Sequence, residues 1–156
     1  MIRLFKHYVP YAVLFLGLID FILLLVSAEL SWLLRAHQLG MMPGDVGGRL
    51  PQLFTFAASL QVAAIAVGVY GAEALQSMRF AVARLLVSIS LGIIFLSLCA
   101  FAWPGSTLWR SNSAYAMGIA FLLLMLLRIF LGSLIGGQAF RRRIMVLGAG
   151  KRAQRI

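Results

Sequence analysis

The sequence predicts an all-α membrane protein in which four transmembrane helices form a bundle. Two observations carry this prediction. Of the 156 residues, 62% are hydrophobic and only 12% are charged, whereas about a quarter of the residues in a soluble domain are charged. The apolar residues also form blocks long enough to span a hydrocarbon core, which needs about 20 residues of helix. A water-soluble fold could not bury this much apolar surface.

The four apolar blocks are the expected spans, and together they make a transmembrane domain over residues 1–137. They run from about 11 to 34, 53 to 70, 85 to 103 and 114 to 135. Pro51 precedes the second block and Pro104 follows the third, as expected where helices begin and end. The first block follows basic residues as a signal peptide would, but it exceeds the roughly 7–15 apolar residues of a signal segment. We therefore expect a retained helix.

Lysine and arginine outnumber aspartate and glutamate by 14 to 4, and their positions predict the orientation. Short cytoplasmic loops are enriched in lysine and arginine. With the N-terminus inside, both termini are cytoplasmic and few basic residues fall outside. These few are Arg35, Arg49 and Arg110. The tryptophans then lie near the outer interface, at positions 32, 103 and 109. No nucleic-acid partner is expected, because no basic stripe alternates with aromatic residues.

Asp20 lies inside the first expected span and Arg128 inside the fourth. An unpaired charge at such a depth costs about 2.5–3.5 kcal/mol on insertion scales. Each residue lies about ten residues, or roughly 15 Å of helix rise, from the cytoplasmic end of its span. We therefore expect a structural ion pair across the bundle. The alternative is that Asp20 and Glu29 line an ion or substrate path, although Glu29 could also reach the interface or meet Arg35.

Residues 138–156 are expected to form a basic linker and the opening of a soluble domain. A β-type run over residues 144–147 precedes Gly148, Gly150 and Ala153. Their spacing matches the turn that holds a pyrophosphate at a helix N-terminus in Rossmann-like domains. The other interpretation is a turn that needs small residues for packing. Because the sequence stops before a βαβ unit is complete, we expect a fragment with an incomplete Rossmann-like domain.

No complete catalytic site is expected in this chain. The two histidines are solitary, and Cys99 is the only cysteine. Neither supplies the clustered ligands that a zinc site requires. The four acidic residues are scattered along the sequence. We therefore expect no metal, no bound cofactor and no catalytic residue here.

The order of these features resembles the N-terminal part of bacterial polyprenyl-phosphate sugar-1-phosphate transferases, especially the exopolysaccharide sugar transferases associated with exosortase systems. The resemblance rests on the start Met1-Ile2-Arg3-Leu4-Phe5-Lys6-His7-Tyr8-Val9-Pro10, the four spans, and the stretch Arg142-Arg143-Ile144-Met145-Val146-Leu147-Gly148-Ala149-Gly150. It implies a multi-pass protein of the inner membrane. The intact enzyme would move a sugar-1-phosphate from a nucleotide sugar to polyprenyl phosphate. Its catalytic acids and Mg²⁺ would belong to a C-terminal domain, so this chain alone would be inactive.

On this interpretation the chain's own role is anchoring, with Arg141, Arg142 and Arg143 near anionic lipid headgroups. Two other classes compete. The same order of features also resembles membrane-anchored nucleotide-sugar dehydratases and epimerases. In those enzymes the glycine turn would bind NAD(P). A small four-helix transporter is the non-enzyme alternative, for which the acid in the first span is suggestive.

Small residues at four-residue spacing, as at Ala64 and Gly68, would let helices approach closely within the bundle or between two copies.

Overall fold

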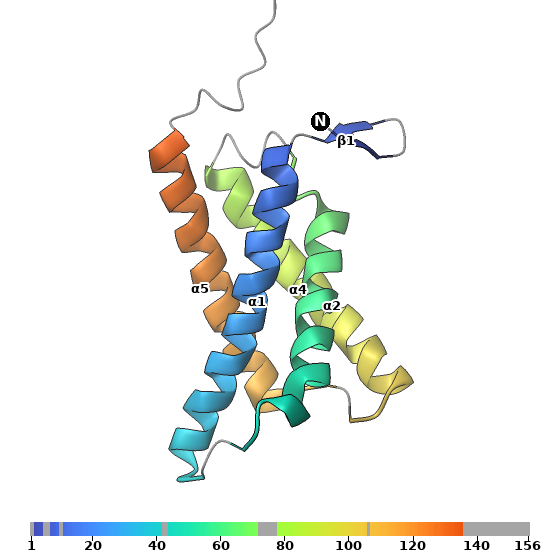
Figure 1. The fold of residues 1–156 in the computed structure, drawn as a ribbon, viewed down its shortest axis with the longest axis vertical. Coiled ribbons are helices and arrows are strands. Elements are labelled where there is room, and N and C mark those ends of the chain that lie inside the picture. Colours follow the sequence, from blue (N-terminus) through green and yellow to red (C-terminus); the bar gives the residue numbers. More distant parts are fainter. Residues whose placement is uncertain are drawn as a thin grey trace, which may run out of the picture.

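A computed structural model describes residues 2–4, 7–9, 11–41, 44–71, 78–105 and 107–135. Its main elements are four long helices that form a bundle (Figure 1). They are α1 (Tyr11–Gln38), α2 (Leu50–Val67), α4 (Met78–Ala102) and α5 (Arg110–Ile135), and a 3-10 turn, η1 (Gly47–Arg49), leads into α2. All four are long and apolar enough to cross a membrane. The chain is thus a multi-pass membrane protein with four candidate spans.

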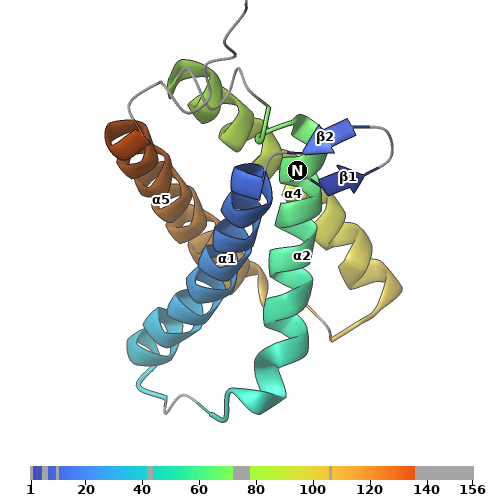
Figure 2. The same ribbon diagram turned by 45° about the horizontal axis from the view of Figure 1, so that its top comes forward.

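The four helices alternate in direction, so the first turn of α1 and the last turn of α5 lie at the same end of the bundle (Figures 1 and 2). We call this the terminal end. Trp32, Trp103 and Trp109 lie toward the opposite end, which we call the tryptophan end. Within the bundle, α1 packs against α2 and α5, while α4 packs mainly against α2.

Alanines and larger apolar side chains share the interior of the bundle, where Phe56, Leu24 and Leu85 are at most 1% exposed. Ala28, Ala57 and Ala116 are fully buried, which allows neighbouring helices to approach closely. Large apolar side chains also cover the outside; Phe101, for example, is 89% exposed. A surface of this kind suits hydrocarbon rather than water. The core therefore combines close helix contacts at the alanines with packing of leucine and phenylalanine side chains.

The α2 helix ends at Val67, short of the expected boundary at residue 70. Gly68 adopts a left-handed conformation with φ of 74°. Its N–H donates to the Ile65 carbonyl at 3.1 Å, and the N–H of Val69 donates to the Ala64 carbonyl at 3.0 Å. This pair of bonds is the Schellman motif, which commonly ends a helix at a glycine. Gly68 thus ends the helix, and the chain turns back toward the core.

The structure contains a short hairpin that the sequence did not predict. It pairs β1 (Ile2–Leu4) with β2 (His7–Val9) in antiparallel orientation before α1. The expected strand over residues 144–147 lies outside the described residues. The same holds for the residues of the basic linker and the glycine turn: Arg141, Arg142, Arg143, Gly148, Gly150 and Ala153.

The contact of Gly92 on α4 with Leu60 on α2 gives a first prediction. A Cβ added to Gly92 would lie 3.0 Å from the Leu60 Cγ atom. Gly92→Val should therefore separate the helices and lower the free energy of unfolding by about 1–3 kcal/mol, measured by unfolding in mixed micelles. Gly118→Val is the matched control, because nothing lies within 4 Å of a Cβ there. Equal losses in the two variants would contradict the described packing.

Candidate functional site

The most distinctive site is a buried charge pair between the first and last helices. The Arg128 Nη2 atom donates to Asp20 Oδ2 at 2.6 Å. The side chains are only 4% and 3% exposed, respectively. Sequence reasoning singled out these two residues by their matching depth, and the structure brings them into contact. A charge-assisted bond of this length is among the stronger contacts that a protein can make.

Two further polar side chains adjoin the pair. The Gln61 Nε2 atom donates to the Tyr70 hydroxyl at 3.0 Å and to the Gly17 carbonyl at 3.2 Å. The Arg128 guanidinium lies 5.7 Å from the centre of the Tyr70 ring, within the range of a cation–π contact. The Tyr70 hydroxyl also lies next to the Asp20 carboxylate. We refer to Asp20, Gln61, Tyr70 and Arg128 as the polar cluster.

The turn after α2 places Tyr70 in the polar cluster. The Arg84 Nη1 atom of α4 donates to the Gly68 carbonyl at 2.8 Å. A cation at a helix C-terminus is favourable because the helix dipole is negative there. A Cβ on Gly71 would lie 2.8 Å from the same Arg84 nitrogen and 3.1 Å from the Gly68 carbonyl oxygen, so a larger residue at 71 would displace the Arg84 side chain. Sequence reasoning missed Tyr70 and Gln61; the glycine at position 68 was the feature that could have revealed the turn.

The polar cluster encloses almost no free space. The adjoining cavity measures about 10 Å³ and is lined by Asp20, Gln61 and Tyr70 among others. A single water needs roughly that volume. Asp20 Oδ1, Gln61 Oε1 and the Arg128 Nε atom are buried there without a hydrogen-bond partner in the described part of the chain. The cluster can therefore hold charges and one small polar molecule, but a substrate has no room.

A second ion pair lies nearer the tryptophan end. The Arg49 Nη2 atom donates to Glu29 Oε1 at 3.0 Å, and the Arg49 guanidinium lies 5.1 Å from the centre of the Trp32 ring. The Arg49 side chain is 8% exposed and that of Glu29 is 26% exposed. Of the alternatives left open for Glu29, the contact with Arg35 is not formed, because Glu29 pairs with Arg49. The η1 turn instead brings Arg49 back over α1.

The remaining candidates for chemistry are dispersed. Within the described residues, no three His, Cys, Asp or Glu side chains lie close enough together to hold a metal ion. Cys99 lies 3.7 Å from the Ser59 hydroxyl, sulfur to oxygen, and His37 is exposed. The polar cluster and the Glu29–Arg49 pair are thus the two sites that carry buried charge in the part of the chain described.

Comparison with protein-family models, curated proteins and solved structures finds no match. The fold and the buried charges define the class as a four-helix, multi-pass membrane protein.

The buried pair generates a second prediction, which a double-mutant cycle tests. Asp20→Asn and Arg128→Gln should each lower the free energy of unfolding in micelles by about 3 kcal/mol, because each leaves one buried charge unpaired. The double variant, with both charges removed, should recover about 2 kcal/mol relative to the sum of the single losses. If the two losses simply add, Asp20 and Arg128 are not partners.

The ion pair between Glu29 and Arg49 gives a third prediction. Arg49→Gln removes the salt bridge to Glu29 and the contact with Trp32, so the free energy of unfolding should fall by about 1–2 kcal/mol. The loss should be smaller than for Arg128→Gln because Glu29 is partly exposed. The tryptophan fluorescence should also change. Arg79→Gln serves as control, since Arg79 is exposed on α4. A loss as large as that of Arg128→Gln would show that the Glu29–Arg49 pair is not an interfacial contact.

Proposed function

We propose that the chain is the membrane-anchoring domain of a bacterial sugar transferase of exopolysaccharide biosynthesis. The intact enzyme transfers a sugar-1-phosphate from a nucleotide sugar to polyprenyl phosphate at the inner membrane. Its catalytic acids and Mg²⁺ belong to a cytoplasmic part that follows the four helices. The four-helix domain holds that part at the bilayer surface, where the lipid-linked acceptor is presented.

The proposal rests on the position of the two ends of the helical bundle, which lie on the same side. The first turn of α1 and the last turn of α5 lie at the terminal end (Figures 1 and 2). Arg79 and Arg84 belong to the first turns of α4 at the same end, and Arg141, Arg142 and Arg143 follow α5 in the sequence. Basic residues favour the cytoplasmic leaflet. A domain attached after α5 would then lie against that leaflet.

The state of the acidic residues also favours an anchor over a transporter. A proton-coupled transporter needs a carboxylate that can exchange its proton along an open path. Both acids of α1 are paired with arginine instead, Asp20 with Arg128 and Glu29 with Arg49. The cavity beside Asp20 holds about 10 Å³. These features suit a fixed scaffold.

The transferase activity is tested with membranes from cells that make the protein from its own gene. We expect the membranes, supplied with undecaprenyl phosphate, Mg²⁺ and a panel of radiolabelled uridine diphosphate sugars, to form a labelled lipid and release uridine monophosphate. Membranes from cells lacking the gene are the control. Conversion of a nucleotide sugar that depends on NAD(P) would instead identify a dehydratase or epimerase. Failure to form a labelled lipid with any sugar would contradict the proposal.

The anchoring geometry generates a fourth prediction, on topology. A green fluorescent protein fused after residue 137 should fluoresce, and alkaline phosphatase fused there should be inactive, because the terminal end faces the cytoplasm. The same two reporters inserted at residue 44, in the loop between α1 and α2, should give the opposite pattern. An active phosphatase at residue 137 would overturn the proposed orientation.

A further inference from the structure

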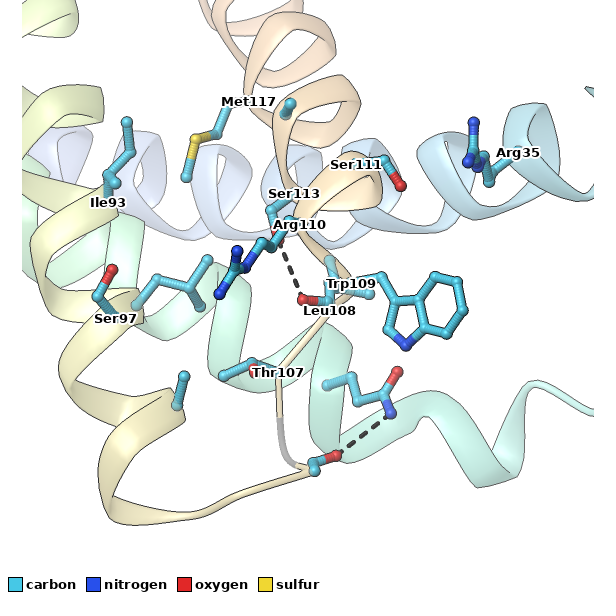
Figure 3. A pocket seen from close by; sticks show the side chains of 15 residues that line it. Arg35, Ile93, Ser97, Thr107, Leu108, Trp109, Arg110, Ser111, Ser113 and Met117 are labelled. Carbon is cyan, nitrogen blue, oxygen red and sulfur yellow. Dashed lines mark hydrogen bonds between the residues drawn. The ribbon is translucent and has the colours of Figure 1, made fainter.

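A much larger cavity opens at the tryptophan end of the bundle. It lies mainly between α4 and α5 and has a volume of about 1170 Å³ (Figure 3). The two helices diverge toward this end, where residues 103–109 connect them (Figures 1 and 2). The cavity is remote from the polar cluster, and neither the anchoring role nor the two ion pairs make use of it.

Two arginines supply the charge of this cavity. Arg35 comes from the last turn of α1, and Arg110 is the first residue of α5. Figure 3 shows Arg110 extending from α5 toward α4, on the side of Ser97. The Arg35 Nε atom is buried and makes no hydrogen bond with any described residue. The described acids that form salt bridges pair with Arg49 and Arg128 instead, so no described acid forms a salt bridge with either arginine of this cavity.

The wall of the cavity is amphipathic along its depth. Near the arginines it carries the hydroxyl-bearing residues Thr107 and Ser111. Deeper between the helices it is lined by Ile93 and Met117. At 1.5 Å of rise per residue, Met117 lies about 10 Å along α5 from Arg110. The cavity therefore joins a cationic, hydroxyl-rich mouth to an apolar slot that reaches into the hydrocarbon.

The mouth also lies at the level of the membrane interface. Trp109 lines it and is 75% exposed, and exposed tryptophan is enriched where hydrocarbon meets headgroups. An arginine at that level binds phosphate oxygens through charge-assisted hydrogen bonds. The slot beneath it would take a hydrocarbon chain. A soluble anion fits the mouth alone, whereas a lipid fits the mouth and the slot.

We propose that this cavity is a binding site for one anionic glycerophospholipid of the surrounding bilayer. The phosphate of the lipid lies against Arg110, and one acyl chain runs between α4 and α5 along Ile93 and Met117. Arg35, which lies apart from Arg110 on α1 (Figure 3), adds positive charge to the mouth. The bound lipid fills the space where the two helices diverge. This site does not depend on the proposed function, because any four-span protein with this cavity would bind the lipid in the same way.

The proposal is tested by native mass spectrometry of the full chain titrated with phosphatidylglycerol. The double variant Arg35→Gln with Arg110→Gln should bind phosphatidylglycerol at least tenfold more weakly than the unaltered chain. Arg79→Gln, which removes an exposed arginine at the terminal end, should bind as the unaltered chain does. Thermal unfolding of each variant in the same detergent checks that the bundle is intact. Equal affinity in all three proteins would overturn the site.

A second variant tests the slot without changing the charge. Ala100→Trp should fill the space beside α4 and weaken phosphatidylglycerol binding, although both arginines remain. Two competitors distinguish the ligand source. Neither inorganic phosphate nor phosphatidylcholine should displace the lipid at equal concentration. Displacement by free phosphate would show that the acyl chain is not bound, and tighter binding of undecaprenyl phosphate at the same arginines would show that a bilayer phospholipid is the wrong ligand.

Discussion

The contact between Asp20 and Arg128 is the constraint on which the rest of the bundle depends. In a bilayer, an apolar helix face can contact either another helix or the equally apolar lipid tails. Apolar packing alone therefore only weakly favours one helix orientation over another. A buried charge changes this, because leaving it unpaired costs several kcal/mol. The 2.6 Å bond from Arg128 to Asp20 therefore specifies which faces of α1 and α5 meet and at what relative height. Ala28 and Ala116, both fully buried, then allow those faces to close.

The helices α2 and α4 are connected to the Asp20–Arg128 pair through the turn that follows α2. Gly68 ends α2 in a left-handed conformation, and the chain then returns Tyr70 to the Arg128 guanidinium. Gln61 on α2 contacts Tyr70 and the α1 backbone, while Arg84 on α4 holds the end of α2. Contacts from all four helices thus converge near the charge pair or on the turn beside it. This convergence suits a rigid support for an attached cytoplasmic domain better than it suits a moving transport path.

The sequence predicts the fold class and the central pair well, and it fails at the details of turns. Hydropathy reveals the four spans because bilayer thickness sets their length, and equal depth identifies Asp20 and Arg128 as partners. Tyr70 was not predictable from hydropathy, because the left-handed glycine at 68 decides whether that ring stays on a helix or turns inward. The sequence also left the partner of Glu29 open and did not indicate Arg49, since Arg49 approaches through the η1 turn rather than along α1 as Arg35 would.

Direct contact between Asp20 and Arg128 within the bilayer can be measured. Solid-state NMR of the chain in lipid bilayers, with isotope-labelled arginine and aspartate, measures the coupling between guanidinium nitrogens and carboxylate carbons. We expect a short-range cross-peak between these two groups that disappears both in Asp20→Asn and in Arg128→Lys, whereas a spectrum without that cross-peak, or one in which either variant leaves it unchanged, would show that Asp20 and Arg128 are not in contact.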